Sequence, residues 1–392
     1  MTQRTPNKRT PFDAGFTIGF IGGGQLARMS ALQAFRFGMN MAVYATSRDP
    51  EPVEHMTPTV FRGNLNDEKA LIDFARNCDL ITLENEFLDS SVLERVQKAT
   101  GTPIFPSPKS FALIEDKLTE KQTFKDAGIS VAPFRKIESP SDLGPFGEEF
   151  GWPYVLKSAK GGYDGYGNAT VRNTEEGMKA WSKLGGNDGR TVIAEAFVPF
   201  TMELAVMVAR NQTGTVAYPC VESIQQGHIC KEIIVPARVP EAIQVQAQEL
   251  AKAAVEAIDG IGLFGFEFFL THDNQILLNE SAPRPHNSGH YTIEGCVTSQ
   301  FENHIRAVCG LPLGDTSLLA PAAVMINLLG TFNGPASARP VHPVLETRNA
   351  HLHIYGKSHS RIGRKMAHLT VLGTDVEKTL SQAQQLAEEI TI

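Results

Sequence analysis

Hydrophobic and polar positions alternate along the first hundred residues as in a unit of parallel strands joined by helices. An apolar run at residues 16–21 is followed by three glycines and by a segment with apolar residues at helical spacing, which Gly38 ends. A second apolar run, residues 41–44, comes next, so the pattern predicts strand, helix and strand. A further helix at 71–75 and a strand at 80–83 continue the alternation. The N-terminal part is therefore expected to contain a parallel sheet.

The pattern changes after a group of prolines near residue 105. A single helix is predicted over residues 108–127, with Ser107 as its N-cap, a proline at its first position and Gly128 as its stop. Between residues 150 and 235, strand-like runs alternate with glycine-rich turns, as in an antiparallel α+β lobe. A helix over about 241–258 then leads into two apolar strands.

Those two strands, residues 264–271 and 276–282, are expected to form a hairpin in which Glu267 faces Glu280. Residues directly opposed on one face lie about 5 Å apart at Cβ. Two carboxylates that close repel each other unless one is protonated or a cation lies between them. Mg²⁺ takes such oxygen ligands, and Asn279 adds an amide oxygen nearby. The alternative is a different register that leaves Glu280 on the surface.

Composition and charge exclude several classes of protein. The 392 residues are 42% hydrophobic, and 36 Lys and Arg stand against 43 Asp and Glu, a net charge of −7. This length suggests two or three domains. A mildly acidic chain is a poor candidate for binding nucleic acid. No apolar run approaches the roughly 20 residues that span a membrane.

The cysteines and the N-terminus point to the cytoplasm. Five widely spaced cysteines without a Cys-x-x-Cys pair favour reduced thiols over disulfides or a structural zinc site. Residues 1–15 begin basic and polar and contain no apolar run of the kind found in a secretory signal. We interpret them as a disordered extension.

Two glycine-rich segments are candidates for phosphate binding. Gly22–Gly24 with Ala27 match G-x-G-x-x-A between a strand and a helix, which aims backbone N–H groups at a phosphate. A dinucleotide site also needs an acid at the end of the second strand, and none occurs before Asp49. A turn that binds another phosphate, or none, is therefore favoured over a nicotinamide site.

The second segment, residues 161–167, has four glycines in seven positions, which indicates close approach to a ligand or unusual backbone angles. It lacks the Gly-Lys-Ser/Thr end of a P-loop and lies between two strand-like runs. A mobile flap over a triphosphate is predicted, with Lys157 able to reach an α- or β-phosphate. An ordinary flexible hairpin with a solvated lysine is the alternative.

Two polar clusters complete the candidate chemistry. In the segment APRPHNSGH, residues 282–290, Arg284 offers a bidentate fork for a planar oxyanion, and His286 and Asn287 add hydrogen-bonding groups on a backbone fixed by prolines. The basic residues of 357–365 fit either a blunted strand edge or a site for a phosphorylated substrate.

Taken in order, these motifs resemble one family. They read GGGQLARM, IEDKLTEKQTF, GGYDGYGN, the pair Glu267 and Asn279-Glu280, APRPHNSGH, VMINLLG and YGKSHSRIGRKMAHL. The chain is similar over residues 16–375 to the N5-carboxyaminoimidazole ribonucleotide synthetases, which are ATP-grasp enzymes of purine biosynthesis. The resemblance implies an α/β and α+β fold with three parts. These are a Rossmann-like N-terminal domain (16–110), a two-lobed ATP-grasp domain (111–315) with a mobile lid lobe at about 130–200, and a small β-rich C-terminal domain (316–392).

The resemblance also implies an activity. Such a ligase joins 5-aminoimidazole ribonucleotide and bicarbonate at the expense of ATP, through carboxyphosphate, and releases ADP and phosphate. ATP and Mg²⁺ are the expected cofactors. A cytoplasmic homodimer without nucleic-acid or membrane partners is the expected form.

Site residues follow from the resemblance position by position. The expected ATP contacts are Lys117, Lys157, the flap residues Gly162, Tyr163, Asp164, Gly165, Tyr166, Gly167 and Asn168, the adenine hinge Glu195, Ala196, Phe197 and Val198, the ribose contact Glu203, and Gln225, Asn279 and Glu280. The expected Mg²⁺ ligands are Glu267 and Glu280. The expected catalytic residues are Tyr163, Asp164, Arg284, His286 and Asn287. The expected contacts to the ribonucleotide are Gln25, Glu84, Lys357 and Arg364.

Two positions depart from the family pattern. Tyr166 replaces an arginine that is common in the flap, and Gln225 replaces a histidine, so both nucleotide contacts stay open. The nearest alternative function is another ATP-grasp ligase, such as a formate-dependent glycinamide ribonucleotide transformylase, which would differ in the 282–290 segment and the C-terminal basic cluster. A non-catalytic nucleotide-binding protein and a nicotinamide oxidoreductase are more distant alternatives.

Overall fold

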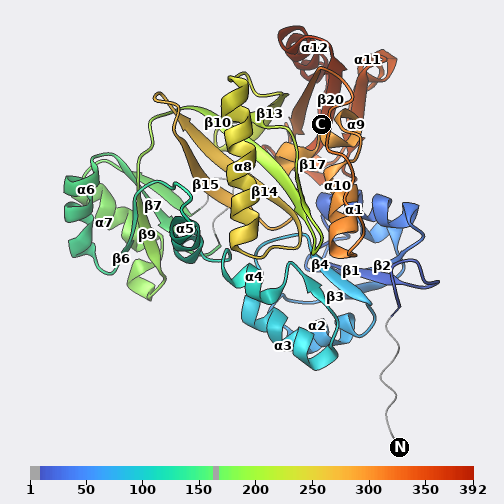
Figure 1. The fold of residues 1–392 in the computed structure, drawn as a ribbon, viewed down its shortest axis with the longest axis horizontal. Helices are drawn as coiled ribbons and strands as arrows, with labels where there is room; N and C mark the ends of the chain where they lie inside the picture. Colours follow the sequence, from blue (N-terminus) through green and yellow to red (C-terminus); the bar gives the residue numbers. More distant parts are fainter. Residues whose placement is uncertain (1–8, 162–166) are drawn as a thin grey trace, which may run out of the picture.

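The computed structural model describes residues 9–161 and 167–392. The N-terminal strands form one parallel sheet in the order β3-β2-β1-β4-β5, drawn in blue and cyan in Figure 1. The strands are β1 (Thr17–Ile21), β2 (Asn40–Ala45), β3 (Val60–Arg62), β4 (Leu80–Leu83) and β5 (Ile104–Phe105). The helical segments are α1 (Gln25–Arg36), the 3-10 turn η1 (Glu54–Met56), α2 (Glu68–Ala75) and α3 (Ser90–Thr100). The predicted order of strand, helix and strand is confirmed.

The next helical segment is broken where one helix was predicted. It consists of α4 (Pro108–Ala112) and α5 (Lys117–Asp126). The end signals are confirmed, because the Ser107 hydroxyl accepts the Ser110 N–H and Gly128 has φ +78°. The break lies at Asp116, whose backbone is extended and whose carboxylate accepts two N–H groups of the first turn of α5. An aspartate in this role begins a new helix, even though the helical spacing of apolar residues continues across it.

A four-stranded antiparallel sheet follows, in the order β6-β9-β7-β8. In Figure 1 it lies at the left of the molecule, beside its own helices. The strands are β6 (Phe134–Ile137), β7 (Tyr154–Ser158), β8 (Asn168–Val171) and β9 (Val192–Ala196). The helical segments are η2 (Pro140–Asp142), α6 (Leu143–Phe150), α7 (Thr174–Lys183) and η3 (Gly186–Asp188). Phe146, Tyr154 and Trp181 are buried in its core.

A nine-stranded sheet forms the centre of the molecule, in the order β15-β14-β10-β12-β13-β16-β20-β18 with β11 paired to β10. Its central strands are β10 (Phe200–Arg210), β11 (Thr215–Ala217), β12 (Val221–Gln226), β13 (Ile229–Val235), β14 (Gly262–Thr271) and β15 (Ile276–Ala282). Its C-terminal strands are β16 (Ala322–Leu329), β18 (Ala350–Ile354) and β20 (Lys365–Gly373). The strands between residues 150 and 235 are therefore divided between two sheets, which corrects the single lobe expected from their common texture.

Helix α8 (Glu241–Ala257) packs across the central sheet (Figure 1). Phe264, Phe266 and Phe268 of β14 are fully buried in the core between them, as predicted. Because side chains alternate along a strand, Glu267 points to the opposite face of the sheet. The hydrophobic alternation of β14 thus places the acidic residue away from the core.

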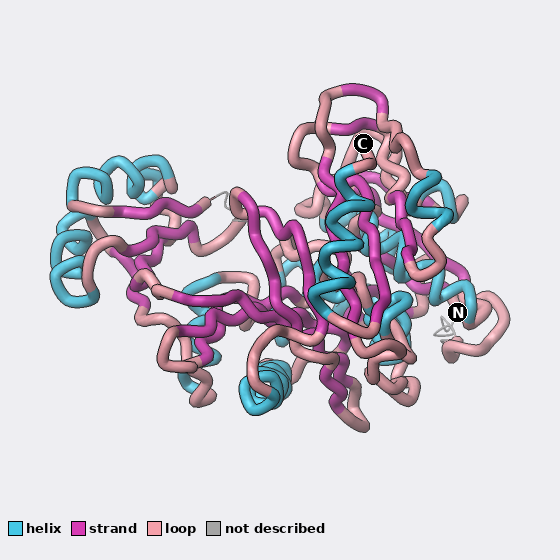
Figure 2. The backbone as a smooth tube through the Cα atoms, turned by 90° about the horizontal axis from the view of Figure 1, so that it is seen from above, coloured by secondary structure: helices cyan, strands magenta, loops and turns pink. Residues whose placement is uncertain are grey.

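The C-terminal part completes the fold. Helix α12 (Val376–Glu388) packs on β16 and β20. The remaining elements are η4 (Asn287–Gly289), α9 (Thr292–Gly295), α10 (Gln300–Val308), β17 (Gly334–Pro335), α11 (His342–Glu346) and β19 (His359–Ser360). Seen from above in Figure 2, the four-stranded sheet projects to one side of the rest. Within the described residues, no helix is long and apolar enough to cross a membrane.

We expect the core between α8 and β14 to dominate the stability of the centre. Phe264→Ala removes a fully buried ring and should lower the free energy of unfolding by about 3–5 kcal/mol. Leu345→Ala is the control, because this side chain is 66% exposed and its truncation should change stability by less than about 0.5 kcal/mol. Chemical denaturation of both variants measures the difference. Equal losses would contradict the placement of Phe264 in the core.

Candidate active site

A cavity of about 490 Å³ lies between the N-terminal sheet and the C-terminal part. Its walls include Gln25, Glu84, Lys357 and Arg364, which are the four residues expected to bind the ribonucleotide, and also Arg361. The first two lie at the carboxyl ends of β1 and β4, and the other three follow β18. The fold thus brings together residues that are more than 270 positions apart in sequence.

The glycine turn before α1 packs against carboxylates of this cavity. A Cβ at Gly23 would lie 2.2 Å from Glu51 Oε2, and one at Gly24 would lie 2.3 Å from Glu84 Oε1. A side chain at either position would therefore have to displace one of these carboxylates. The glycines therefore make room for Glu51 and Glu84 beside the cavity.

The charged groups of the cavity have shifted pKa values. Burial raises the pKa of Glu84 to about 7, and the nearby carboxylates of Glu51 and Glu86 act in the same direction. Burial, together with Arg364, lowers the pKa of Lys357 to about 7, and its ammonium group donates to the Lys365 carbonyl (2.6 Å). An acid and a base that both titrate near neutral pH therefore line one cavity.

The carboxylate pair lies on the central sheet. Glu267 pairs with Glu280 across β14 and β15, which confirms the predicted register. A bulge at Asn279 shifts the register beyond this pair, so that Phe268 faces Leu278. Burial and the neighbouring Glu280 raise the pKa of Glu267, whereas the Lys117 ammonium group lowers the pKa of Glu280. The surroundings thus favour the neutral form of the Glu267 carboxyl group and the ionised form of the Glu280 carboxyl group.

This donor set fits a hydrated Mg²⁺. Among the described residues, no group of three or more His, Cys, Asp or Glu side chains could hold a metal ion by itself. Mg²⁺ characteristically takes one or two carboxylates and completes its shell with water and substrate phosphates. Glu267 and Glu280 supply two such carboxylates and leave the other positions to phosphate and water.

Three lysines form ion pairs with Glu280 and with Glu195 of β9. Lys117 Nζ lies 2.9 Å from Glu280 Oε2. Lys157 Nζ lies 2.9 Å from Glu195 Oε2, and Lys121 Nζ lies 3.2 Å from the same oxygen. Lys117 and Lys157 were expected at the ATP phosphates, whereas Lys121 was not predicted. Its spacing of four from Lys117 on α5 was the available signal, because such residues share a helix face.

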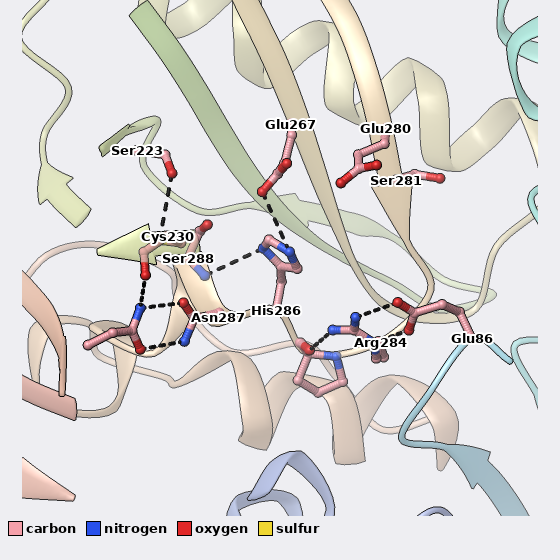
Figure 3. A network of polar contacts seen from close by, with 12 residues as sticks. Glu86, Ser223, Cys230, Glu267, Glu280, Ser281, Arg284, His286, Asn287 and Ser288 are labelled. Atoms are coloured by element: carbon pink, nitrogen blue, oxygen red, sulfur yellow. Dashed lines mark hydrogen bonds and ion pairs between the residues drawn. The ribbon is translucent and has the colours of Figure 1, made fainter. Parts of the chain in front are cut away.

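The 282–290 segment joins the carboxylates to the N-terminal sheet (Figure 3). Arg284 makes a bidentate ion pair with Glu86, with Nη2 2.8 Å from Oε1 and Nε bonded to Oε2. Glu86 was not predicted. It follows the carboxyl end of β4, where parallel sheets commonly bind ligands, and that position was the signal.

His286 lies beside the carboxylate pair, with Nε2 3.6 Å from Glu267 Oε1 (Figure 3). Burial and the charge of Arg284 lower the pKa of His286 to about 3, so the ring is neutral. The Ser288 N–H donates to Nδ1, which assigns the ring proton to Nε2. Asn287 exchanges two side-chain hydrogen bonds with Asn327, of 2.9 and 2.6 Å. His286 thus faces the carboxylates, while Asn287 is tied to β16.

The expected nucleotide contacts lie along β9 and β10. Glu195 and Ala196 end β9, Phe197 is exposed, and Val198 is buried. Glu203 is on β10, and burial raises its pKa even though Gln225 hydrogen-bonds to it. Gln225, which departs from the family pattern, is therefore hydrogen-bonded to Glu203, the residue expected to contact the ribose.

Part of the flap is not described. The expected residues Gly162, Tyr163, Asp164, Gly165 and Tyr166 lie outside the described residues. Gly167 has φ +85°, and Asn168 begins β8. On the other side, Lys160 and Gly161 line a second cavity of about 490 Å³ together with Glu86. The described N-terminal end of the flap, Lys160 and Gly161, therefore lines the same cavity as Glu86, the partner of Arg284.

Three family models match the chain in succession. The ribonucleotide synthetase preATP-grasp domain matches residues 16–115. The ATP-grasp domain matches residues 122–301. The phosphoribosylaminoimidazole carboxylase C-terminal domain matches residues 323–382.

Similar proteins cover nearly the whole chain. The N5-carboxyaminoimidazole ribonucleotide synthase of Mycobacterium bovis is 36% identical over 389 residues, which cover 97% of this chain and 90% of the relative. The chain belongs to the N5-carboxyaminoimidazole ribonucleotide synthase family. The phosphoribosylaminoimidazole carboxylase of Ogataea methanolica is 41% identical over 96% of this chain and 70% of the relative. The crystal structure of the Aspergillus clavatus N5-carboxyaminoimidazole synthase with ADP and 5-aminoimidazole ribonucleotide matches with a TM-score of 0.85, at 34% identity, over 95% of this chain and 98% of that chain.

Membership in this family confirms three predictions from the sequence: the resemblance itself, the mixed α/β and α+β fold, and the class of ATP-grasp ligase. The individual site residues stay predictions, and in the structure they form two neighbouring groups. One group lines the cavity near Lys357, and the other surrounds the Glu267–Glu280 pair.

The shifted pKa of Glu84 predicts a pH-dependent stability. The folded protein keeps this proton up to a pH of about 7, whereas the ordinary value is 4.5. The carboxyl group therefore contributes stability below pH 4.5 that is lost as the pH rises to 7. Glu84→Gln cannot ionise, so it should be more stable than the natural protein at pH 8 and should lose this advantage at pH 4.5.

Chemical denaturation at several pH values measures this effect. Glu148→Gln is the control, because Glu148 is exposed on α6 and its substitution should leave the pH dependence unchanged. A stability difference for Glu84→Gln that does not vary between pH 4.5 and 8 would contradict the raised pKa.

Proposed function

We propose that this protein catalyses the ATP-dependent carboxylation of 5-aminoimidazole ribonucleotide with bicarbonate. The products are N5-carboxyaminoimidazole ribonucleotide, ADP and phosphate, as in purine biosynthesis. One observation carries the proposal. The segment after β4 contributes Glu84 to the cavity lined by Lys357 and Arg364, and it contributes Glu86 to the ion pair with Arg284. A phosphorylated substrate in the cavity would therefore lie next to the loop that adjoins the carboxylate pair. The ADP and 5-aminoimidazole ribonucleotide of the Aspergillus clavatus complex support the same pair of ligands.

The first chemical step is phosphoryl transfer. A bicarbonate oxygen attacks the γ-phosphorus of ATP, the bond to the β-phosphate oxygen breaks, and carboxyphosphate and ADP form. Negative charge builds up on the phosphate oxygens, and the ammonium groups of Lys117 and Lys157, which pair with Glu280 and Glu195 in the structure, would neutralise it. Bound Mg²⁺ would be held by Glu267 and Glu280 and would draw charge from the β- and γ-phosphates.

The second step transfers the carboxyl group. Carboxyphosphate breaks into phosphate and CO₂, the amine of the ribonucleotide attacks the CO₂ carbon, and the amine then loses a proton. The guanidinium group of Arg284 suits a planar carboxylate, and the neutral His286 ring can donate a hydrogen bond from Nε2. Tyr163 and Asp164 are proposed to lie near the amine, where Asp164 could orient it or accept its proton.

Three further features belong to the proposal. The flap would exclude water from the short-lived carboxyphosphate. The basic residues Lys357 and Arg364, with Gln25, would hold the 5′-phosphate. The family resemblance supports a cytoplasmic homodimer, which sedimentation analysis of the purified protein would test.

The decisive experiment measures ADP release with different acceptors. We expect ADP formation when MgATP is supplied with 5-aminoimidazole ribonucleotide and bicarbonate, and a carboxylated product by mass spectrometry. Formate with glycinamide ribonucleotide is the comparison, and it should give only the background rate. Turnover with formate and none with bicarbonate would replace the proposal by the transformylase alternative.

Lys357 provides a separate prediction about the cavity. Lys357→Met removes one charged hydrogen bond to the substrate phosphate and should raise KM for the ribonucleotide by about 10- to 100-fold, with kcat changed by less than about threefold. The exposed Lys378→Met on α12 is the control and should leave both constants unchanged. Steady-state kinetics measures the constants.

The pH dependence of KM gives a further check. Because the pKa of Lys357 is about 7, the ammonium group loses its proton above that pH, and KM of the natural protein should then rise. The rise should be absent in Lys357→Met. A parallel rise in both proteins would assign it to another group.

A further inference from the structure

Helix α5 holds the strand that carries Glu280. Strand β15 is the edge of the central sheet, so its outer side has no strand partner among the described residues. Three side chains from the first two turns of α5 bond to three consecutive residues of β15. The contacts are Lys121 Nζ to the Asn279 carbonyl (3.1 Å), Lys117 Nζ to Glu280 Oε2 (2.9 Å), and the Ser281 N–H and hydroxyl to Glu120 Oε1 (2.8 and 2.6 Å).

Lys121 differs from its neighbours because it also reaches the other sheet. Its ammonium group lies 3.2 Å from Glu195 Oε2 at the end of β9, and the same oxygen lies 2.9 Å from Lys157 Nζ. All three side chains are deeply buried, with 2% of Lys121, 4% of Glu195 and 9% of Lys157 exposed. Two buried cations therefore share one carboxylate.

The proposed function assigns these two cations different tasks. If Lys157 moves to an ATP phosphate, Glu195 loses one of its two partners. A buried carboxylate without a counter-ion is strongly unfavourable. Lys121 is placed to prevent this, because its second bond to the Asn279 carbonyl ties it to β15.

We propose that Lys121 is a positioning residue that keeps the Glu195 carboxylate paired while Lys157 binds ATP. The inference rests on the proposed function, since that function assigns Lys157 to the phosphates. Lys121 joins the expected adenine hinge, which begins at Glu195, to the strand of Glu280. Its removal should therefore weaken nucleotide binding more than binding of the ribonucleotide.

A double-mutant cycle with ADP binding as the readout tests this proposal. Lys121→Met should raise Kd for ADP at least tenfold, measured by calorimetry, and leave KM for 5-aminoimidazole ribonucleotide within about twofold. The matched control is Lys125→Met, an exposed position one turn further along α5, which should leave both constants unchanged. In a Glu195→Gln background, where no carboxylate needs a partner, adding Lys121→Met should change Kd by less than about threefold.

The possible outcomes distinguish failure of the role proposed for Lys121 from failure of the proposed function. An equal effect of Lys121→Met in both backgrounds, or none in either, would overturn the role of Lys121. Should Lys121→Met alone fail to fold, the double variant should fold and bind ADP like Glu195→Gln, and its failure to fold would also overturn the proposal. Absence of ADP binding by the natural protein would instead refute the proposed function.

Discussion

The proximity of two carboxylates on one face of the central sheet is the constraint on which the rest of the site depends. Glu267 and Glu280 face each other across β14 and β15, with 18% of the Glu267 side chain and 45% of the Glu280 side chain exposed. Like charges at that distance are tolerated only with cations or a shared proton. The chain supplies Lys117 at Glu280 and places the neutral His286 at Glu267. Helix α5 and the 282–290 segment therefore converge on this hairpin for electrostatic reasons.

The same charge balance explains how the site can accept a polyanion. Lys117 and Lys157 each pair with a carboxylate, Glu280 and Glu195 respectively. Under the proposed function, a triphosphate would exchange one anionic partner for another, which costs less than bringing free charges out of water. Arg284 would follow the same rule, because a substrate carboxylate could take the place of Glu86, with which it pairs in the structure. The proposed function thus uses a site preorganised by ion pairs that its ligands would replace.

Local rules predicted those parts of the structure that local interactions determine. Alternation along β14 separated the phenylalanines from Glu267, and hairpin geometry placed Glu280 opposite, up to the bulge at Asn279 that no alternation rule anticipates. The break at Asp116 was missed because a capping aspartate competes with an apolar pattern that continues across it. Lys121 and Glu86 were missed because their partners are distant in sequence. Only the family resemblance predicted that Gln25, Glu84, Lys357 and Arg364 would line one binding site.

The glycines before α1 show how a motif acquires meaning from its surroundings. A glycine-rich turn at a helix start is usually interpreted as a phosphate site, yet Glu51 and Glu84 occupy the space beside Gly23 and Gly24. Two acids at such a turn disfavour a diphosphate but suit hydroxyl groups, which donate hydrogen bonds to carboxylates. The cations that suit a phosphate, Lys357 and Arg364, line the same cavity. Under the proposed function, the acids of this cavity would bind the hydroxyl groups of the ribonucleotide, and Lys357 and Arg364, with Gln25, would bind its phosphate.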